Sequence, residues 1–180
     1  MAGIELRRLT PADACLFREI RLEGLQHDPD AFSSTFEDER AQPLSFFEQR
    51  LIDSAVFGAF RGAELLGVAG FRIQPGPKHG HKGLLWGMYV RPAARQTGIG
   101  RRLVEAVIAH ARGEVELLQL SVISDNRPAR RLYASLGFEE YGIERRAAKY
   151  RGEYHDDVLM AKTLADLGEN AASHSEGATA

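Results

Sequence analysis

The stretch Arg95-Gln96-Thr97-Gly98-Ile99-Gly100-Arg101-Arg102-Leu103 decides how this chain folds. It follows an apolar run at 84–90 that is typical of a strand, and it opens a helical pattern. Its two glycines allow the backbone to come close to a ligand, and the first turn of a helix leaves N–H groups without partners. Those N–H groups and the partial positive charge of a helix start attract anions. The stretch therefore predicts a phosphate-binding turn between a strand and a helix.

Two familiar phosphate-binding motifs do not fit this spacing. A nucleotide P-loop needs Lys and then Ser or Thr after its last glycine, whereas Arg101 and Arg102 follow Gly100. A dinucleotide fingerprint needs a third glycine where this chain has Leu103, and it lies nearer the start of its domain. An ordinary left-handed turn without a ligand is the simpler alternative.

The rest of the chain predicts an α/β fold of the mixed α+β type. Strand-like runs cover residues 4–8, 55–61, 64–73, 84–90, 115–123, 138–148 and 153–163, and helical patterns begin at Thr10, at Leu44, at the glycine segment and at Asn126. Strand and helix do not simply alternate, which suits a mixed sheet with helices on both faces. The strands at 84–90 and 115–123 should be parallel, joined by a right-handed helical crossover.

Length and composition predict one globular domain. The chain has 180 residues, of which 44% are hydrophobic and 27% charged, as in ordinary soluble proteins. We expect the domain to cover residues 1–165 and the small, polar residues 166–180 to form a disordered tail. The net charge of −2 argues against nucleic-acid binding. No apolar run approaches the roughly 20 residues that cross a bilayer, so no membrane partner is expected.

Cysteine content and the N-terminus indicate a cytoplasmic protein. The single cysteine, Cys15, fits a reducing compartment, and its place in the first helix predicts a small buried side chain. The first residues carry no signal-peptide pattern. His79 and His81 lie in a loop without Cys or carboxylate neighbours, so we expect no metal site.

An ordered set of motifs resembles the GNAT superfamily of N-acetyltransferases. The set is Arg95-x-x-Gly98-x-Gly100 after an apolar strand, then Asn126, then Tyr133, then Leu136-Gly137-Phe138. The resemblance covers residues from about 55 to 160. It implies a twisted, mostly antiparallel sheet with helices on both faces, in which a central pair of parallel strands splays apart. It also implies acetyl-CoA as cosubstrate.

The resemblance assigns residues to the coenzyme. The positions that match the pyrophosphate-binding segment are Arg95, Gln96, Thr97, Gly98, Ile99, Gly100 and Arg101. The strand residues Met88, Tyr89 and Val90 would pair with the pantetheine arm, and a bulge at Gly87 would open the sheet beside them. The N–H of Met88 would stabilise the thioester oxyanion. Asn126 would hold the coenzyme or cap its helix, and Tyr133 would protonate the departing thiolate.

The implied activity is acetyl transfer from acetyl-CoA to a primary amine of a small molecule, by direct attack on the thioester. The alternatives are a protein acetyltransferase acting on a lysine or an N-terminus, and a non-catalytic acyl-CoA-binding module. The loops at 31–42 and 74–83 would select the acceptor, and Trp86 would pack in the core or line the acceptor pocket. Members of this family often dimerise, so a homodimer is compatible with the sequence.

The general base is open at this point. Leu84 stands where many family members carry a glutamate. The acidic residues 37–39 lie in a loop that commonly borders the acceptor site, and they would suit a cationic acceptor. Asp156 and Asp157, near the last strand, are weaker candidates. Deprotonation through ordered water is a further alternative.

Overall fold

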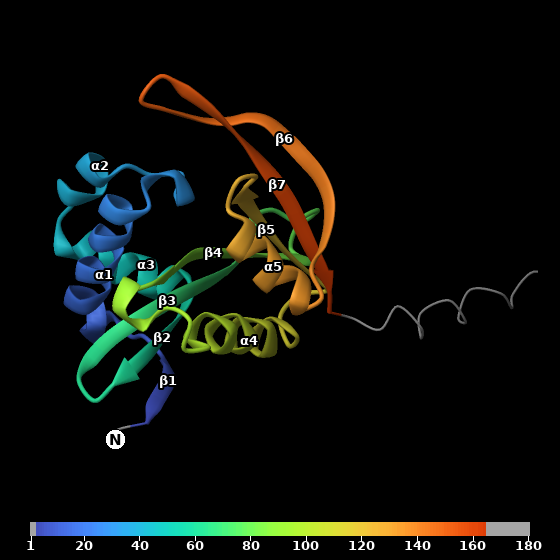
Figure 1. Ribbon diagram of the computed structural model, residues 1–180. Coiled ribbons are helices and arrows are strands. Elements are labelled where there is room, and N and C mark those ends of the chain that lie inside the picture. Colours follow the sequence, from blue (N-terminus) through green and yellow to red (C-terminus); the bar gives the residue numbers. More distant parts are fainter. Residues whose placement is uncertain (1–2, 165–180) are drawn as a thin grey trace, which may run out of the picture.

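A computed structural model describes residues 3–164, so the predicted tail at 166–180 lies outside the described residues. The chain forms one seven-stranded sheet in the order β1-β2-β3-β4-β5-β7-β6 (Figure 1). The strands are β1 (Ile4–Arg8), β2 (Ala55–Arg61), β3 (Glu64–Ile73), β4 (Lys82–Val90), β5 (Leu117–Ile123), β6 (Glu139–Tyr150) and β7 (Glu153–Thr163). All neighbours pair antiparallel except β4 and β5, which are parallel. This confirms the predicted fold class.

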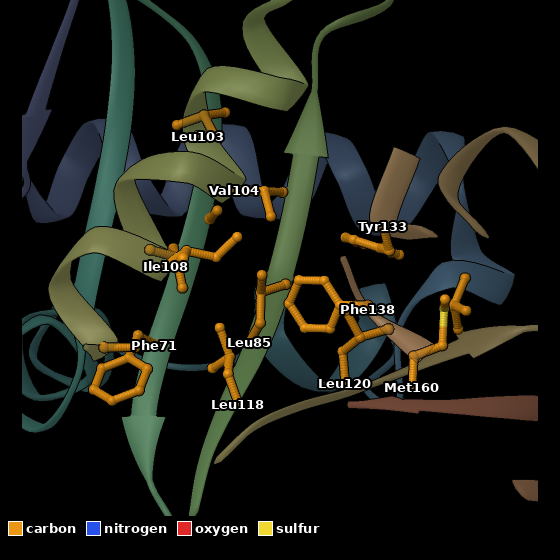
Figure 2. Close-up of a cluster of buried hydrophobic side chains, with 14 of the residues drawn as sticks. Phe71, Leu85, Leu103, Val104, Ile108, Leu118, Leu120, Tyr133, Phe138 and Met160 are labelled. Atoms are coloured by element: carbon orange, nitrogen blue, oxygen red, sulfur yellow. The ribbon is translucent and has the colours of Figure 1, made fainter. Parts of the chain in front are cut away.

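Helices cover both faces of the sheet. They are α1 (Ala14–His27), α2 (Phe36–Arg40), α3 (Leu44–Asp53), α4 (Ile99–Ala111) and α5 (Arg127–Ser135). On one face, Phe17 of α1 and Phe47 of α3 pack against strand residues such as Val68. On the other face, α4 and α5 bury apolar side chains against β3, β4 and β5. Figure 2 shows this second cluster, with Leu103, Ile108 and Tyr133 facing the sheet.

Local sequence patterns predicted most of the helices and strands. The hairpin between β2 and β3 turns at Gly62, whose φ of +59° is the left-handed value that glycine adopts without strain. The short helix α2 was not predicted. The prediction that Cys15 is buried was wrong, because the buried face of α1 runs through Ala14 and Phe17 and leaves Cys15 exposed.

The two parallel strands separate, and this opening is the feature that creates the site. Pairing between β4 and β5 is confined to 82–84 against 117–119, although both strands continue. Farther along β4, Gly87 and Met88 lie opposite the single residue Ala69, which is a bulge, and Gly87 has φ of +62°. The bulge predicted at Gly87 is thus present at the splay. In Figure 1 the β6–β7 hairpin arches past β5 toward the side of the molecule that carries α1 and α2.

Candidate active site

The turn between β4 and α4 presents free N–H groups. Gly98, at the N-cap of α4, has φ of +82°, and Gln96 has φ of +62°. None of the N–H groups from Gln96 to Arg101 donates a hydrogen bond within residues 3–164, and the first helical bond near them runs from Arg102 N to Gly98 O. A Cβ atom at Gly98 would meet nothing within 4 Å, so the turn is open to solvent. The geometry is that of an anion-binding helix start.

Side chains around this turn hold its shape. Thr97 Oγ1 donates to Ala94 O at 2.6 Å. Arg95 donates from Nε to Val90 O at 3.0 Å and forms an ion pair with Asp28. Arg101 pairs with Glu105 at 2.9 Å and reaches Ser135 on α5 at 3.2 Å. Both arginines therefore already have partners, whereas the main-chain N–H groups at 96–101 have none among residues 3–164.

The strand residues before the turn differ in where they point. Arg91 N donates to Leu66 O of β3, so the N–H and C=O of Val90 point to the opposite edge, into the splay. The Tyr89 side chain lies on the α1 face, where its hydroxyl donates to Glu23 at 3.1 Å. Burial, with the nearby Glu23 charge, raises the pKa of Tyr89 to about 12. The Tyr89 side chain therefore packs β4 against α1 and does not enter the cleft.

A cleft of about 670 Å³ lies in the splay between β4 and β5. Of the residues predicted for the site, Met88, Asn126 and Tyr133 line it. The turn predicted to bind phosphate does not line this cleft but adjoins it, because a Cβ atom at Gly100 would lie 3.0 Å from Met88 Cε. The structure thus brings the strand, the α5 residues and the turn to one continuous region.

Tyr133 reaches the cleft from the buried face of α5. Its side chain is 6% exposed and packs edge-on against Phe138, with ring centroids 5.8 Å apart. Its hydroxyl forms no hydrogen bond to any residue that the structure describes. Burial raises the pKa of Tyr133 well above its usual range. The phenol is therefore protonated at neutral pH and is available as a proton donor.

Asn126 caps α5 and lines the cleft at the same time. Its side-chain oxygen accepts from Ala129 N at 3.2 Å, which satisfies one of the unpaired N–H groups of the helix start. The cap orients α5 so that Ala129 and Tyr133, one turn apart, both face the cleft.

One carboxylate that was a weaker candidate for the general base in the sequence analysis lies in the cleft. Asp157 on β7 lines the cleft and is half-buried. Burial raises the pKa of Asp157, and Glu144 raises it further, against the lowering effects of a Ser121 hydrogen bond and His155. Asp156 instead pairs with Arg145 at 2.7 Å and accepts from Arg146 N at 2.8 Å. Adjacent strand residues point to opposite faces, so the two aspartates face different sides of the sheet.

The other acidic candidates do not line the cleft. Asp38 is engaged at the start of α2, where Asp38 N donates to the N-cap Thr35 Oγ1 at 3.2 Å and Thr35 Oγ1 donates to Asp38 Oδ2 at 2.7 Å. Glu39 is 3% exposed and binds Arg21 through both oxygens, at 2.9 and 2.7 Å. Leu84, the last residue of β4 that pairs with β5, lines the cleft. No acid therefore replaces it on that strand.

The two loops predicted to select the acceptor contribute unequally to the lining of the cleft. Residues 31–34 of the first loop line it, whereas the second contributes only Pro75. Trp86 also lines it, one of its two expected places. Among residues 3–164, no three His, Cys, Asp or Glu side chains gather as a metal site requires. No helix in that range is long and apolar enough to cross a membrane.

Comparison with known proteins places this geometry in a family. The sequence profile of the Acetyltransferase (GNAT) family matches residues 22–138. The chain is 32% identical to N-alpha-acetyltransferase RimI of Mycobacterium tuberculosis, over 91% of this chain and 94% of the relative. It is 35% identical to an aminoglycoside N(6')-acetyltransferase type 1 of Stenotrophomonas maltophilia, over 75% of this chain and 86% of the relative.

A solved structure shares the fold. That of yncA from Salmonella typhimurium with its cofactor acetyl-CoA superposes with a TM-score of 0.77, at 22% identity, over 94% of this chain and 99% of that one. The profile match spans more than half of the chain, from α1 through α5. The chain belongs to the GNAT family of acetyltransferases and is an acyltransferase.

Proposed function

We propose that this protein transfers the acetyl group of acetyl-CoA to a primary amine of a small molecule, by direct attack of the amine on the thioester. The observation that carries the proposal is the row of N–H groups at 96–101, which have no partner in the described part of the chain and lie beside the cleft that holds Tyr133. A pyrophosphate fits such a row, because the N–H groups need acceptors and the helix start favours negative charge. The acetyl-CoA bound to yncA supports this choice of donor.

The splay gives the pantetheine arm its place. Beyond Leu84 and Gln119, β4 and β5 no longer pair, so main-chain groups on the facing edges no longer bond to the neighbouring strand. The N–H of Val90 points into this gap, and Met88 lines it. In the proposal these strand residues pair with the arm, and the N–H of Met88 stabilises the oxyanion of the tetrahedral intermediate. Loss of one such donor typically lowers turnover about 100-fold or more.

Asp157 is the proposed proton acceptor. The attacking amine must be neutral, so the ammonium form of the acceptor loses a proton to a base before or during attack. Asp157 is the half-buried carboxylate on the acceptor side of the cleft, and its raised pKa makes it a stronger base than an exposed aspartate. It takes the role that Leu84 cannot fill.

Tyr133 is the proposed proton donor to the leaving group. When the intermediate collapses, the C–S bond breaks and the sulfur leaves as a thiolate, which takes the phenolic proton. Burial keeps the phenol protonated until the sulfur departs, and because the same surroundings also disfavour a free thiolate, the leaving sulfur is a stronger base there than in water. The products are the N-acetyl amine and coenzyme A.

The second candidate function is acetylation of a protein N-terminus. It is favoured by the 32% identity to the RimI relative, whose name specifies an N-alpha-acetyltransferase. The 35% identity to the aminoglycoside acetyltransferase favours a small-molecule acceptor.

One experiment tests the proposal and separates the two acceptors. The full chain is incubated with acetyl-CoA and a panel of small primary amines or peptides, thiol release is followed, and products are identified by mass spectrometry. We expect acetyl-CoA to bind in calorimetry and one class of small amines to be acetylated. Acetylation confined to peptide N-termini would overturn the acceptor assignment, and failure to bind acetyl-CoA would overturn the whole proposal.

A further inference from the structure

The acceptor side of the cleft carries a cluster of arginines that the proposed chemistry does not use. Arg21 of α1, Arg50 of α3 and Arg72 of β3 all line the cleft. They come from three separate elements, and only the folded chain brings them together. We call them the arginine cluster.

The positive charge of the arginine cluster is only partly balanced. Arg21 is 5% exposed and donates two hydrogen bonds to the Glu39 carboxylate. Arg50 shares one oxygen of the same carboxylate, through Nη1 at 3.1 Å. Arg72 forms no ion pair within residues 3–164. One buried carboxylate therefore balances Arg21 and Arg50 together, and Arg50 and Arg72 keep donors for another anion.

Aromatic rings fix the plane of Arg50. Its guanidinium carbon lies 4.6 Å from the ring centre of Phe46 and 5.6 Å from that of Trp86. Trp86 in turn packs tightly on β3, because a Cβ atom at Gly70 would lie 2.5 Å from Trp86 Cε2. Stacked guanidinium groups lose little freedom when they bind a planar anion through two N–H groups. Arg50 is thus preorganised for a carboxylate.

Close approach of like charges supports an anion at this position. Burial lowers the pKa of the Arg50 guanidinium, and the positive charges of Arg21 and Arg72 lower it as well, while Glu39 raises it. An anion that binds between Arg50 and Arg72 would relieve this repulsion.

The acids of the cleft lie apart from that position or are already engaged. Asp53, at the end of α3, accepts from Gln49 Nε2 at 2.8 Å. Asp30 lies 4.0 Å from His155 Nε2. Asp157 is on β7, across the splay from β3 and β4. The cleft therefore has a positive part built on α1, α3 and β3, and a carboxylate on the β7 side.

We propose that the acceptor is an amine that also carries a carboxylate, and that Arg50 and Arg72 bind the carboxylate while the amino group faces Asp157. This inference rests on the proposed function and narrows it to a substrate class. It replaces the cationic acceptor suggested by the acidic residues 37–39, since Glu37 and Asp38 do not line the cleft and Glu39 is neutralised by arginine.

The test compares each amino carboxylate with its own carboxamide. The probes are the protein amino acids and the straight-chain series from glycine to 6-aminohexanoate, so that the amine–carboxylate separation varies. The carboxamide of an α-amino acid has the less basic amine, so chemistry alone favours the carboxamide. We expect at least one acid to exceed its carboxamide by about tenfold or more in kcat/KM, which is the worth of a charged hydrogen-bond pair.

Variants assign that preference to the arginine cluster. Arg72→Gln removes a charge at an exposed side chain, and Arg50→Lys keeps the charge while removing the two-pronged donor. Each should lower kcat/KM for the acid more than for the carboxamide, which brings their ratio toward one. Arg61→Gln, at an exposed arginine on β2 away from the cleft, should leave the ratio unchanged.

The outcomes separate this inference from the proposed function. If small amines are acetylated but no acid is preferred over its carboxamide, the inference is wrong and the function stands. The inference is also wrong if a preference exists that neither Arg72→Gln nor Arg50→Lys reduces. If no amine is acetylated and acetyl-CoA does not bind, the proposed function itself is wrong.

Discussion

Tyr133 and Asp157 line the same cleft from opposite faces of the sheet. Tyr133 packs with Val158 in the cluster beneath α4 and α5, and the side chain of Asp157, one residue earlier on β7, points to the other face. Two groups on opposite faces can meet one substrate only where the sheet is open. The splay between β4 and β5 is that opening, so in the proposed mechanism α5 supplies the proton donor and β7 the proton acceptor, on opposite sides of the thioester.

Tyr133→Phe should separate catalysis from binding. The substitution keeps the buried ring and its contact with Phe138 but removes the phenolic proton. We expect kcat to fall about 100-fold, the usual worth of a general acid, while the Kd for acetyl-CoA changes less than about threefold. Steady-state kinetics and calorimetry provide both values. Tyr154→Phe, at an exposed tyrosine of β7, is the matched control. Equal loss of turnover and affinity would identify Tyr133 as a binding or packing residue.

Asp157→Asn should lower activity and raise stability. The pKa of Asp157 is raised in the folded protein, so ionising it costs folding free energy, and that cost appears as pH rises through the folded pKa. Asparagine removes the charge, so we expect a higher Tm at pH 7 together with a loss of about 100-fold in kcat/KM.

The neighbouring aspartate is the control. Asp156→Asn breaks an exposed pair with Arg145, and hydrogen bonds from Arg146 N and Arg145 lower the pKa of Asp156. We expect nearly full activity and a Tm that does not rise. A lower Tm for Asp157→Asn with activity retained would show that Asp157 is structural.

Much of the frame was predictable because its signals are local. The left-handed turn at Gly62 and the glycine turn before α4 each depend on a few neighbouring residues, as does the cap at Asn126. Helix α2 was not predicted because its five residues, Phe36 to Arg40, are too few to show a periodic apolar face. Cys15 was misplaced because one residue along a helix turns the side chain by about 100°.

The acceptor side of the site was not predictable in the same way. Whether Asp156 or Asp157 faces the cleft depends on the register of β7 against β5, which long-range pairing fixes. The arginine cluster depends on α1, α3 and β3 meeting at one place, with Glu39 between them. No spacing in the sequence shows such a meeting.

Gly98→Ala should weaken acetyl-CoA binding beyond its cost to stability. Gly98 has φ of +82°, where a Cβ atom adds strain of about 1–2 kcal/mol and tilts the N–H groups that follow. We expect the Kd for acetyl-CoA to rise about tenfold, the value of one charge-assisted hydrogen bond.

The chain offers a matched control for backbone strain. Gly62 has φ of +59° in the β2–β3 turn, and a Cβ atom at Gly62, like one at Gly98, would meet nothing within 4 Å. Gly62→Ala should lose similar stability in denaturant unfolding and bind acetyl-CoA normally. If both variants bind equally well, the turn at Gly98 does not hold the coenzyme.

Glu39→Gln should destabilise the protein strongly. Glu39 is the carboxylate between Arg21 and Arg50, and its loss leaves buried positive charge without a partner, at a cost of about 3–5 kcal/mol. Urea unfolding at pH 7 measures the change. Glu37→Gln, at an exposed glutamate of the same helix, should change the free energy of unfolding by less than about 0.5 kcal/mol.

Acidification should imitate Glu39→Gln. Burial raises the pKa of Glu39, but the hydrogen bonds and charges of Arg21 and the charge of Arg50 outweigh it, so the net pKa is lowered. A carboxylate with a lowered folded pKa stabilises the fold above its unfolded value of about 4.3, and this contribution disappears as pH falls through the folded pKa. The stability gap between the unsubstituted protein and Glu39→Gln should therefore be full at pH 7 and narrow below pH of about 4. A gap that stays constant down to acid pH would show that Glu39 acts through its shape, and that its charge does not hold the arginines.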